Sequence, residues 1–132
     1  MSDIRHPVHA SYDDLVRYIQ GRLAPERLSV IDPLALAHRR RDGADIQLLD
    51  VREPCEREVC FIADSRHIPL GQIVDRVHEL SLASPIVVYC HHGARSLQAV
   101  LWLRQQGFAE ATNLSGGIDA WAEMVEPAMA RY

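Results

Sequence analysis

Residues 86–103 read IVVYCHHGARSLQAVLWL, and this stretch decides the fold. It opens with a short apolar run, 86–89, which is typical of a strand buried on both faces of a parallel sheet. From Ser96 onward, apolar residues recur at helical spacing. The turn between them must reverse the chain within a few residues, and Gly93 can adopt the positive φ that most residues resist. The stretch therefore predicts a strand, a tight turn and a helix.

Cys90 stands where the predicted strand meets the turn. A thiol at that point faces the unpaired amides of the turn, the positive end of the helix dipole and the guanidinium of Arg95, all of which favour the thiolate. The imidazoles of His91 and His92 add positive charge when protonated. A buried structural cysteine is the alternative, but the polar residues that follow cannot all pack in a core. We therefore predict that Cys90 is a nucleophile whose substrate or product is an anion.

Four motifs along the chain together resemble the rhodanese family of sulfurtransferases. They are LLDVRE at 48–53, HIPLG at 67–71, CHHGARS at 90–96 and NLSGGIDAW at 113–121. The resemblance covers residues 28–132 and implies an α/β fold, a central parallel sheet flanked by helices on both faces. It also implies that Cys90 is catalytic, that the loop around it binds the substrate, and that two further residues support the loop. The loop residues are His91, His92, Gly93, Ala94, Arg95 and Ser96, and the supporting residues are Asp50 and Arg52.

The length of the cysteine loop separates two classes of enzyme. Protein-tyrosine and cell-cycle phosphatases place five residues between cysteine and arginine, whereas here four residues separate Cys90 from Arg95. Ser96 stands at the phosphatase arginine position. Because a shorter turn makes a smaller anion cradle, the loop favours a terminal sulfur over a phosphoryl group. A phosphatase or an arsenate reductase is therefore the less favoured alternative.

The resemblance implies a thiosulfate sulfurtransferase-like enzyme that carries a sulfane sulfur on Cys90 as a persulfide. The donor would be a small molecule such as thiosulfate, and the acceptor would be cyanide, a thiol or a sulfur-carrier protein. The chemistry needs no metal and no organic cofactor. The final residues, EPAMARY at 126–132, resemble the tails of rhodanese domains found with sulfur-carrier activating enzymes. A rhodanese-fold regulatory or redox-sensing module stays open as a different class, although retention of Cys90, Gly93 and Arg95 favours the enzyme.

Composition limits the other functions. At 132 residues, 48% hydrophobic and 24% charged, the chain is typical of one globular domain, and its net charge of −4 argues against general nucleic-acid binding. It contains no apolar run of about 18 residues that would cross a membrane. The N-terminus lacks the apolar segment of a secretory signal, so we expect a cytoplasmic protein. The sequence leaves the oligomeric state undecided.

The cysteine content argues against a disulfide framework, because three is an odd number in a chain with no export signal. Cys55 and Cys60 lack the spacing of a zinc site. We expect Cys60 to be packed and Cys55 to lie near the surface. Whether either has a redox role stays open.

The remaining elements follow from apolar periodicity. Residues 1–27 are expected to form an N-terminal extension with one helix, capped by Ser11. Strands are expected over 28–31, 46–51, 65–69 and 111–114, and helices over 34–41, 54–59, 70–80 and 118–121. The helix over 70–80 should bury Leu70, Ile73, Val74, Val77 and Leu80.

Overall fold

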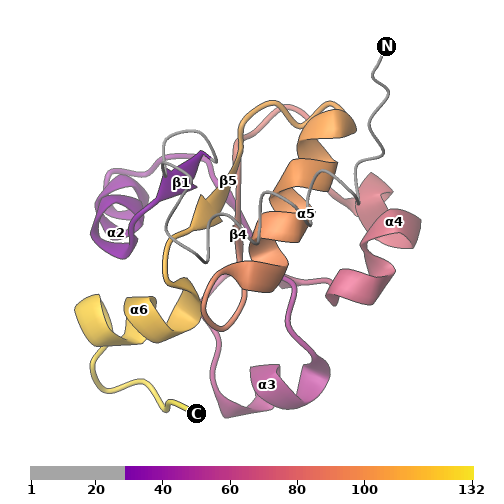
Figure 1. Ribbon diagram of the computed structural model, residues 1–132. Coiled ribbons are helices and arrows are strands. Elements are labelled where there is room, and N and C mark those ends of the chain that lie inside the picture. The colour runs from indigo at the N-terminus through magenta and orange to yellow at the C-terminus, as the bar shows by residue number, and fades with distance from the viewer. Residues whose placement is uncertain (1–28) are drawn as a thin grey trace, which may run out of the picture.

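The structure, a computed structural model, describes residues 29–132 (Figure 1). Its centre is a five-stranded sheet in the order β1-β5-β4-β2-β3, and every pair of neighbours is parallel. The strands are β1 (Val30–Ile31), β2 (Gln47–Asp50), β3 (Arg66–His67), β4 (Ile86–Tyr89) and β5 (Ala111–Leu114). The predicted fold class is confirmed. The N-terminal extension and the helix predicted within it lie outside the described residues.

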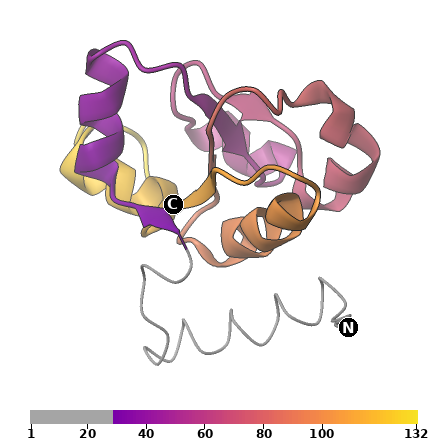
Figure 2. The same cartoon turned by 90° about the horizontal axis from the view of Figure 1, so that it is seen from above.

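Helices cover both faces of the sheet (Figures 1 and 2). One face carries α2 (Pro33–Arg41) and α6 (Gly117–Met124), and the other carries α4 (Ile73–Arg76) and α5 (Ala94–Gln105). Successive residues of a strand alternate between the two cores, as the pleat requires. Thus Val88 packs in the cluster beneath α5, while Val87 packs in the cluster beneath α2 and α6.

The segment 70–80 differs from the single helix that its periodicity predicts. It consists of a 3₁₀ turn η2 (Leu70–Gln72), the four-residue α4, and a second 3₁₀ turn η3 (Val77–Glu79). Residues advance by about 120° per position in a 3₁₀ turn instead of about 100°, so the apolar stripe does not keep one face. Val74, expected to be buried, is 66% exposed, and this prediction is wrong.

Because the strands are parallel, their carboxyl ends meet at one edge of the sheet. The short helix α3 (Pro54–Val59), α6 and the C-terminal residues gather at this edge (Figure 1). In open α/β sheets this is the edge where ligands bind. Within the described residues, no helix is both long and apolar enough to cross a membrane.

Candidate active site

Cys90 follows β4 directly and lies at the start of the loop that leads into α5. Its side chain belongs to the core cluster beneath α5 and is 1% exposed. Gly93 is the N-cap of α5 and has a φ of 114°, in the left-handed region that the turn requires. Ala94 begins the helix. The sequence thus placed strand, turn and helix where the structure has them.

A set of uncharged groups surrounds the Cys90 sulfur, and we call Gly93, Ser96 and Asn113 the neutral donor set. The Gly93 N–H and the Ser96 N–H donate to Cys90 Sγ at 3.1 and 3.4 Å. Ser96 Oγ lies 3.3 Å from the sulfur and 2.5 Å from Asn113 Oδ1, so its one proton serves either acceptor. Asn113 Nδ2 in turn donates to Gly93 O at 3.1 Å. These donors stabilise negative charge on the sulfur.

The N-terminus of α6 fixes the other side of the loop. The Ile118 N–H donates to Cys90 O at 2.9 Å, and the Asp119 N–H donates to His91 O at 3.1 Å. Gly117 has a φ of 64°, and a Cβ built on it would lie 2.6 Å from Cys90 O. Only glycine allows this approach. The sequence predicted a turn at residues 115–117 but carried no sign that it touches the cysteine loop.

Asp50 and Arg52 form a fully buried ion pair at the end of β2. Arg52 Nε and Nη2 donate to the two Asp50 carboxylate oxygens at 3.0 and 2.9 Å, and both side chains are 0% exposed. Asp50 also accepts from Arg57 at 3.1 Å and from the Tyr89 hydroxyl at 3.2 Å. Burial opposes the charge on Arg52, but hydrogen bonds to Asp50 and Tyr132 raise its pKa above the ordinary value.

Arg95 lies in the first turn of α5, directly after the loop, and its guanidinium binds Glu56 of α3. Arg95 Nη1 and Nη2 donate to Glu56 Oε1 and Oε2 at 2.6 and 2.8 Å. Tyr132 links this pair to the buried one, because its hydroxyl donates to Glu56 Oε2 at 2.8 Å and accepts from Arg52 Nη1 at 2.9 Å. We call Asp50, Arg52, Glu56, Arg95 and Tyr132 the charged network. The hydrogen bonds from Arg95 lower the pKa of Glu56 to about 2.

Sequence reasoning missed Glu56 and Tyr132. Glu56 carries a local signal, because Glu53 and Glu56 form the capping box of α3. Tyr132 carries none, since it lies 76 residues from Glu56 along the chain.

The His91 ring stacks on the Tyr132 ring and packs against the tilted ring of His92. The centroids of the His91 and Tyr132 rings lie 4.0 Å apart, and the angle between the ring planes is 12°. The centroids of the His91 and His92 rings lie 3.9 Å apart, and the angle between those planes is 31°. Burial, followed by the neighbouring His92, lowers the pKa of His91, so this imidazole adds less positive charge than the sequence suggested. Its Nε2 is buried and has no hydrogen-bond partner within residues 29–132.

Asp119 brings a third potential metal ligand to the histidine pair, since one atom from each of His91, His92 and Asp119 lies within 4.8 Å of the others. The sequence pointed to no such cluster. Asp119 Oδ1 already accepts from Arg131 Nη2 at 2.9 Å, and Asp119 Oδ2 lies 3.7 Å from His92 Nε2.

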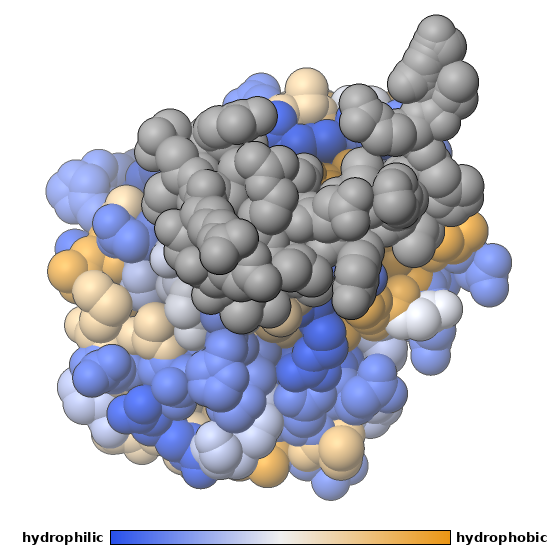
Figure 3. Space-filling view, in the orientation of Figure 1, coloured by the Kyte–Doolittle hydropathy of each residue, from blue (hydrophilic) through white to orange (hydrophobic). Residues whose placement is uncertain are grey.

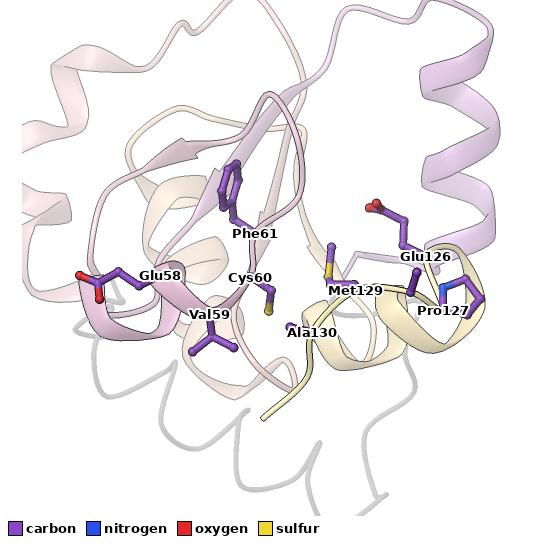
Figure 4. Close-up of a pocket in the computed structure, with 9 residues that line it drawn as sticks. Glu58, Val59, Cys60, Phe61, Glu126, Pro127, Met129 and Ala130 are labelled. Atoms are coloured by element: carbon purple, nitrogen blue, oxygen red, sulfur yellow. The ribbon is translucent and has the colours of Figure 1, made fainter.

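A groove of about 520 Å³ runs between the end of α3 and the C-terminal segment (Figure 4). Cys60 lies in its lining, partly buried, with Sγ 4.0 Å from Arg52 Nη1. Val59 and Phe61, at its rim, are 44% and 49% exposed. Elsewhere on this part of the surface, over α3 and α6, mostly hydrophilic residues are visible (Figure 3). Cys55 is exposed, as expected.

Comparison with known proteins agrees with this geometry. Residues 34–124 match the sequence profile of the rhodanese-like domain. The chain is 40% identical over 100 residues to a sulfurtransferase of Allochromatium vinosum, covering 76% of this chain and 94% of that protein. It is 35% identical over 100 residues to the thiosulfate sulfurtransferase GlpE of Pseudomonas aeruginosa, covering 76% and 82%.

A solved structure is similar as well. The rhodanese-related protein of Thermoplasma volcanium superposes with a TM-score of 0.69 at 32% identity, covering 75% of this chain and 95% of that one. The motifs around Cys90, the parallel sheet and these relatives lead to one conclusion: the chain belongs to the rhodanese-like domain family.

Proposed function

We propose that this rhodanese-type enzyme is a sulfurtransferase that moves a sulfane sulfur from a donor such as thiosulfate to a thiophilic acceptor through a persulfide on Cys90. The observation that carries the proposal is the neutral donor set, which directs two N–H groups and a hydroxyl at Cys90 Sγ where α5 begins. Such an arrangement supports a thiolate nucleophile and the charge that moves outward onto a bound sulfur.

The reaction has two halves. In the first, the Cys90 thiolate attacks the outer sulfur of thiosulfate, the S–S bond of the donor breaks, and sulfite leaves with the electron pair. In the second, cyanide, a thiol or a sulfur-carrier protein attacks the outer sulfur of the persulfide and restores the thiolate. The Gly93 and Ser96 amides stabilise the terminal sulfur between the two halves. Asp50 and Arg52 act as supports that hold the neighbouring chain in place.

Intact-mass measurement tests the proposal. After incubation with thiosulfate, the protein should gain one sulfur atom that cyanide removes as thiocyanate. Cys90→Ser should neither gain the sulfur nor form thiocyanate above background, whereas Cys55→Ser, at an exposed position, should behave like the parent. Thiocyanate formation by Cys90→Ser at the parent rate would refute the proposal. Efficient hydrolysis of an aryl phosphate without sulfur uptake would favour the phosphatase alternative.

A further inference from the structure

Glu56 forms a salt bridge with Arg95, the arginine of the active-site motif. The two contacts, at 2.6 and 2.8 Å, join both carboxylate oxygens to both terminal nitrogens of Arg95, which is the strong bidentate geometry. The Glu56 side chain is 16% exposed and that of Arg95 is 36% exposed, so solvent screens the pair only in part. In this state the charge of Arg95 is balanced before any donor arrives.

Other groups hold the Glu56 carboxylate in place. The Glu53 N–H donates to Oε1 at 3.0 Å, and the Tyr132 hydroxyl donates to Oε2 at 2.8 Å. Arg52 Nη1 donates to the same hydroxyl at 2.9 Å and so orients it. The pKa of about 2 keeps Glu56 ionised at every pH at which a thiolate enzyme works. The carboxylate therefore competes permanently for Arg95.

This competition bears on the choice of donor. Thiosulfate carries two negative charges and gains most from an unbalanced cation, whereas the neutral form of a persulfide, R–S–SH, gains little. We propose that Glu56 is a specificity-determining residue that disfavours dianionic donors and leaves the site suited to organic persulfides. This inference rests on the proposed function and names the donor class of the same site.

The favoured first half-reaction is balanced without a further reactant. The Cys90 thiolate attacks the outer sulfur of R–S–SH, the donor S–S bond breaks, and R–S⁻ leaves with the electron pair. Cys90 is left as Cys90–S–SH, and the proton stays on the transferred sulfur. No oxidant or reductant takes part.

The rate at which Cys90 gains one sulfur, followed by intact mass, tests the donor preference. Two donors are compared, thiosulfate and β-mercaptoethanol persulfide, whose only acidic group near neutral pH is the persulfide itself. Glu56→Gln should raise the rate with thiosulfate by about tenfold and leave the rate with the persulfide within about twofold of the parent. The reason is that the dianion is attracted strongly to the positive charge of Arg95 once Glu56 no longer balances it, whereas the neutral persulfide is not. An unchanged thiosulfate rate, or an equal rise with both donors, would overturn the inference.

Matched variants separate specificity from general damage. Glu58→Gln removes the same charge from an exposed position of α3 and should leave the ratio of the two rates unchanged. Tyr132→Phe keeps the aromatic ring but removes the hydrogen bond from the Tyr132 hydroxyl to Glu56 Oε2. It should raise the ratio of the thiosulfate rate to the persulfide rate by about two- to threefold. Both rises should shrink as salt is added, which a purely structural effect would not do. If Glu56→Gln does not fold, Glu56→Asp and Tyr132→Phe decide the question in the same assay.

Alkylation of Cys90 tests the charge effect without any sulfur transfer. The relative rates of anionic iodoacetate and neutral iodoacetamide at Cys90 are measured by peptide mass spectrometry, with exposed Cys55 as the internal reference. Glu56→Gln should raise the iodoacetate-to-iodoacetamide ratio at Cys90 and not at Cys55. If neither sulfur donor modifies Cys90 in any variant, the proposed function fails, while this ratio still decides the role of Glu56. A constant ratio would refute the inference even if sulfur transfer is observed.

Discussion

The two sides of the cysteine loop are held by different kinds of interaction. On one side, the neutral donor set holds the sulfur with uncharged N–H and O–H groups in a closely packed core. On the other, the charged network joins ions and a tyrosine from the end of β2, from α3, from the loop and from the C-terminal residues. The neutral side fixes geometry, whereas the charged side sets the electrostatic balance of the loop.

This contrast separates two kinds of sensitivity. Uncharged hydrogen bonds in a packed site depend on shape, so a single extra methyl group can disrupt them. Buried ions depend on complete pairing, because one unpaired charge costs several kcal/mol. Mutations on the two sides should therefore differ in size and in pH dependence.

The largest loss of stability is expected from the charged side. Arg52→Met removes the main partner of Asp50 and leaves a 0% exposed carboxylate whose remaining donors among the described residues are Arg57, the Tyr89 hydroxyl and the backbone N–H of residue 52. The free energy of unfolding, measured with urea, should fall by about 3–5 kcal/mol. Arg66→Met, in an exposed pair with Glu79, should cost less than about 1 kcal/mol. Equal losses in the two variants would contradict the view that the buried pair dominates.

A loss of about 3 kcal/mol is expected at the tight contact between the start of α6 and the cysteine loop. Gly117→Ala combines a φ of 64° with a Cβ at 2.6 Å from Cys90 O, so the loop must shift, and sulfur transfer should fall with stability. Gly43→Ala is the control, since Gly43 also has a positive φ of 82°, but a Cβ added there would meet no atom of residues 29–132 within 4 Å. It should cost about 1 kcal/mol and leave activity unchanged. Thermal unfolding and the thiocyanate assay measure both effects.

A fall in pH should weaken the stabilising interactions of the charged network but not those of the neutral donor set. The folded-state pKa of Glu56 is lowered from 4.5 to about 2, so ionised Glu56 contributes stability that is fully present above pH 4.5. That contribution, about 2 kcal/mol after allowance for solvent, is lost as the pH falls toward 2. The stability difference between the parent and Glu56→Gln should shrink over this range in urea titrations. A difference that stayed constant between pH 5 and pH 2.5 would contradict the assignment.

The smallest effect on stability is expected from Ser96→Ala. The variant loses the hydroxyl shared between Cys90 Sγ and Asn113 Oδ1, and should be destabilised by about 1 kcal/mol. The rate of sulfur uptake should fall further than stability does, by about tenfold, because the hydroxyl stabilises charge on the reacting sulfur. Asn113→Asp is a further test of the difference between the neutral donor set and the charged network, because it places a charge in a site that consists of neutral groups.

The family and the fold were predictable because their signals are local. The apolar run 86–89, the glycine turn and the helix that follows are contiguous, and each has its own periodicity. Part of the neutral side follows from this local order, because Gly93 and Ser96 stand three and six residues from Cys90, whereas the role of Asn113 in β5 was not predicted.

Most contacts of the charged network could not be predicted from the sequence. Apart from the Asp50–Arg52 pair, whose members are two residues apart, its contacts join residues 39 to 80 positions apart, and no pattern in the sequence shows that Tyr132 meets Arg52. The sequence placed Arg95 in the loop, but the direction of its guanidinium depends on Glu56 of another helix. The broken segment 70–80 also escaped prediction, since 3₁₀ turns and α-helix share similar apolar spacing over a few residues.

The two hydrogen bonds from the start of α6 to Cys90 O and His91 O have a consequence for folding. They come from residues that follow the cysteine in the chain, and they bind two carbonyl groups of the cysteine loop. A growing chain thus contains its nucleophile long before it can complete the cradle around it. Reactivity at Cys90 should then report whether α6 has docked against the cysteine loop.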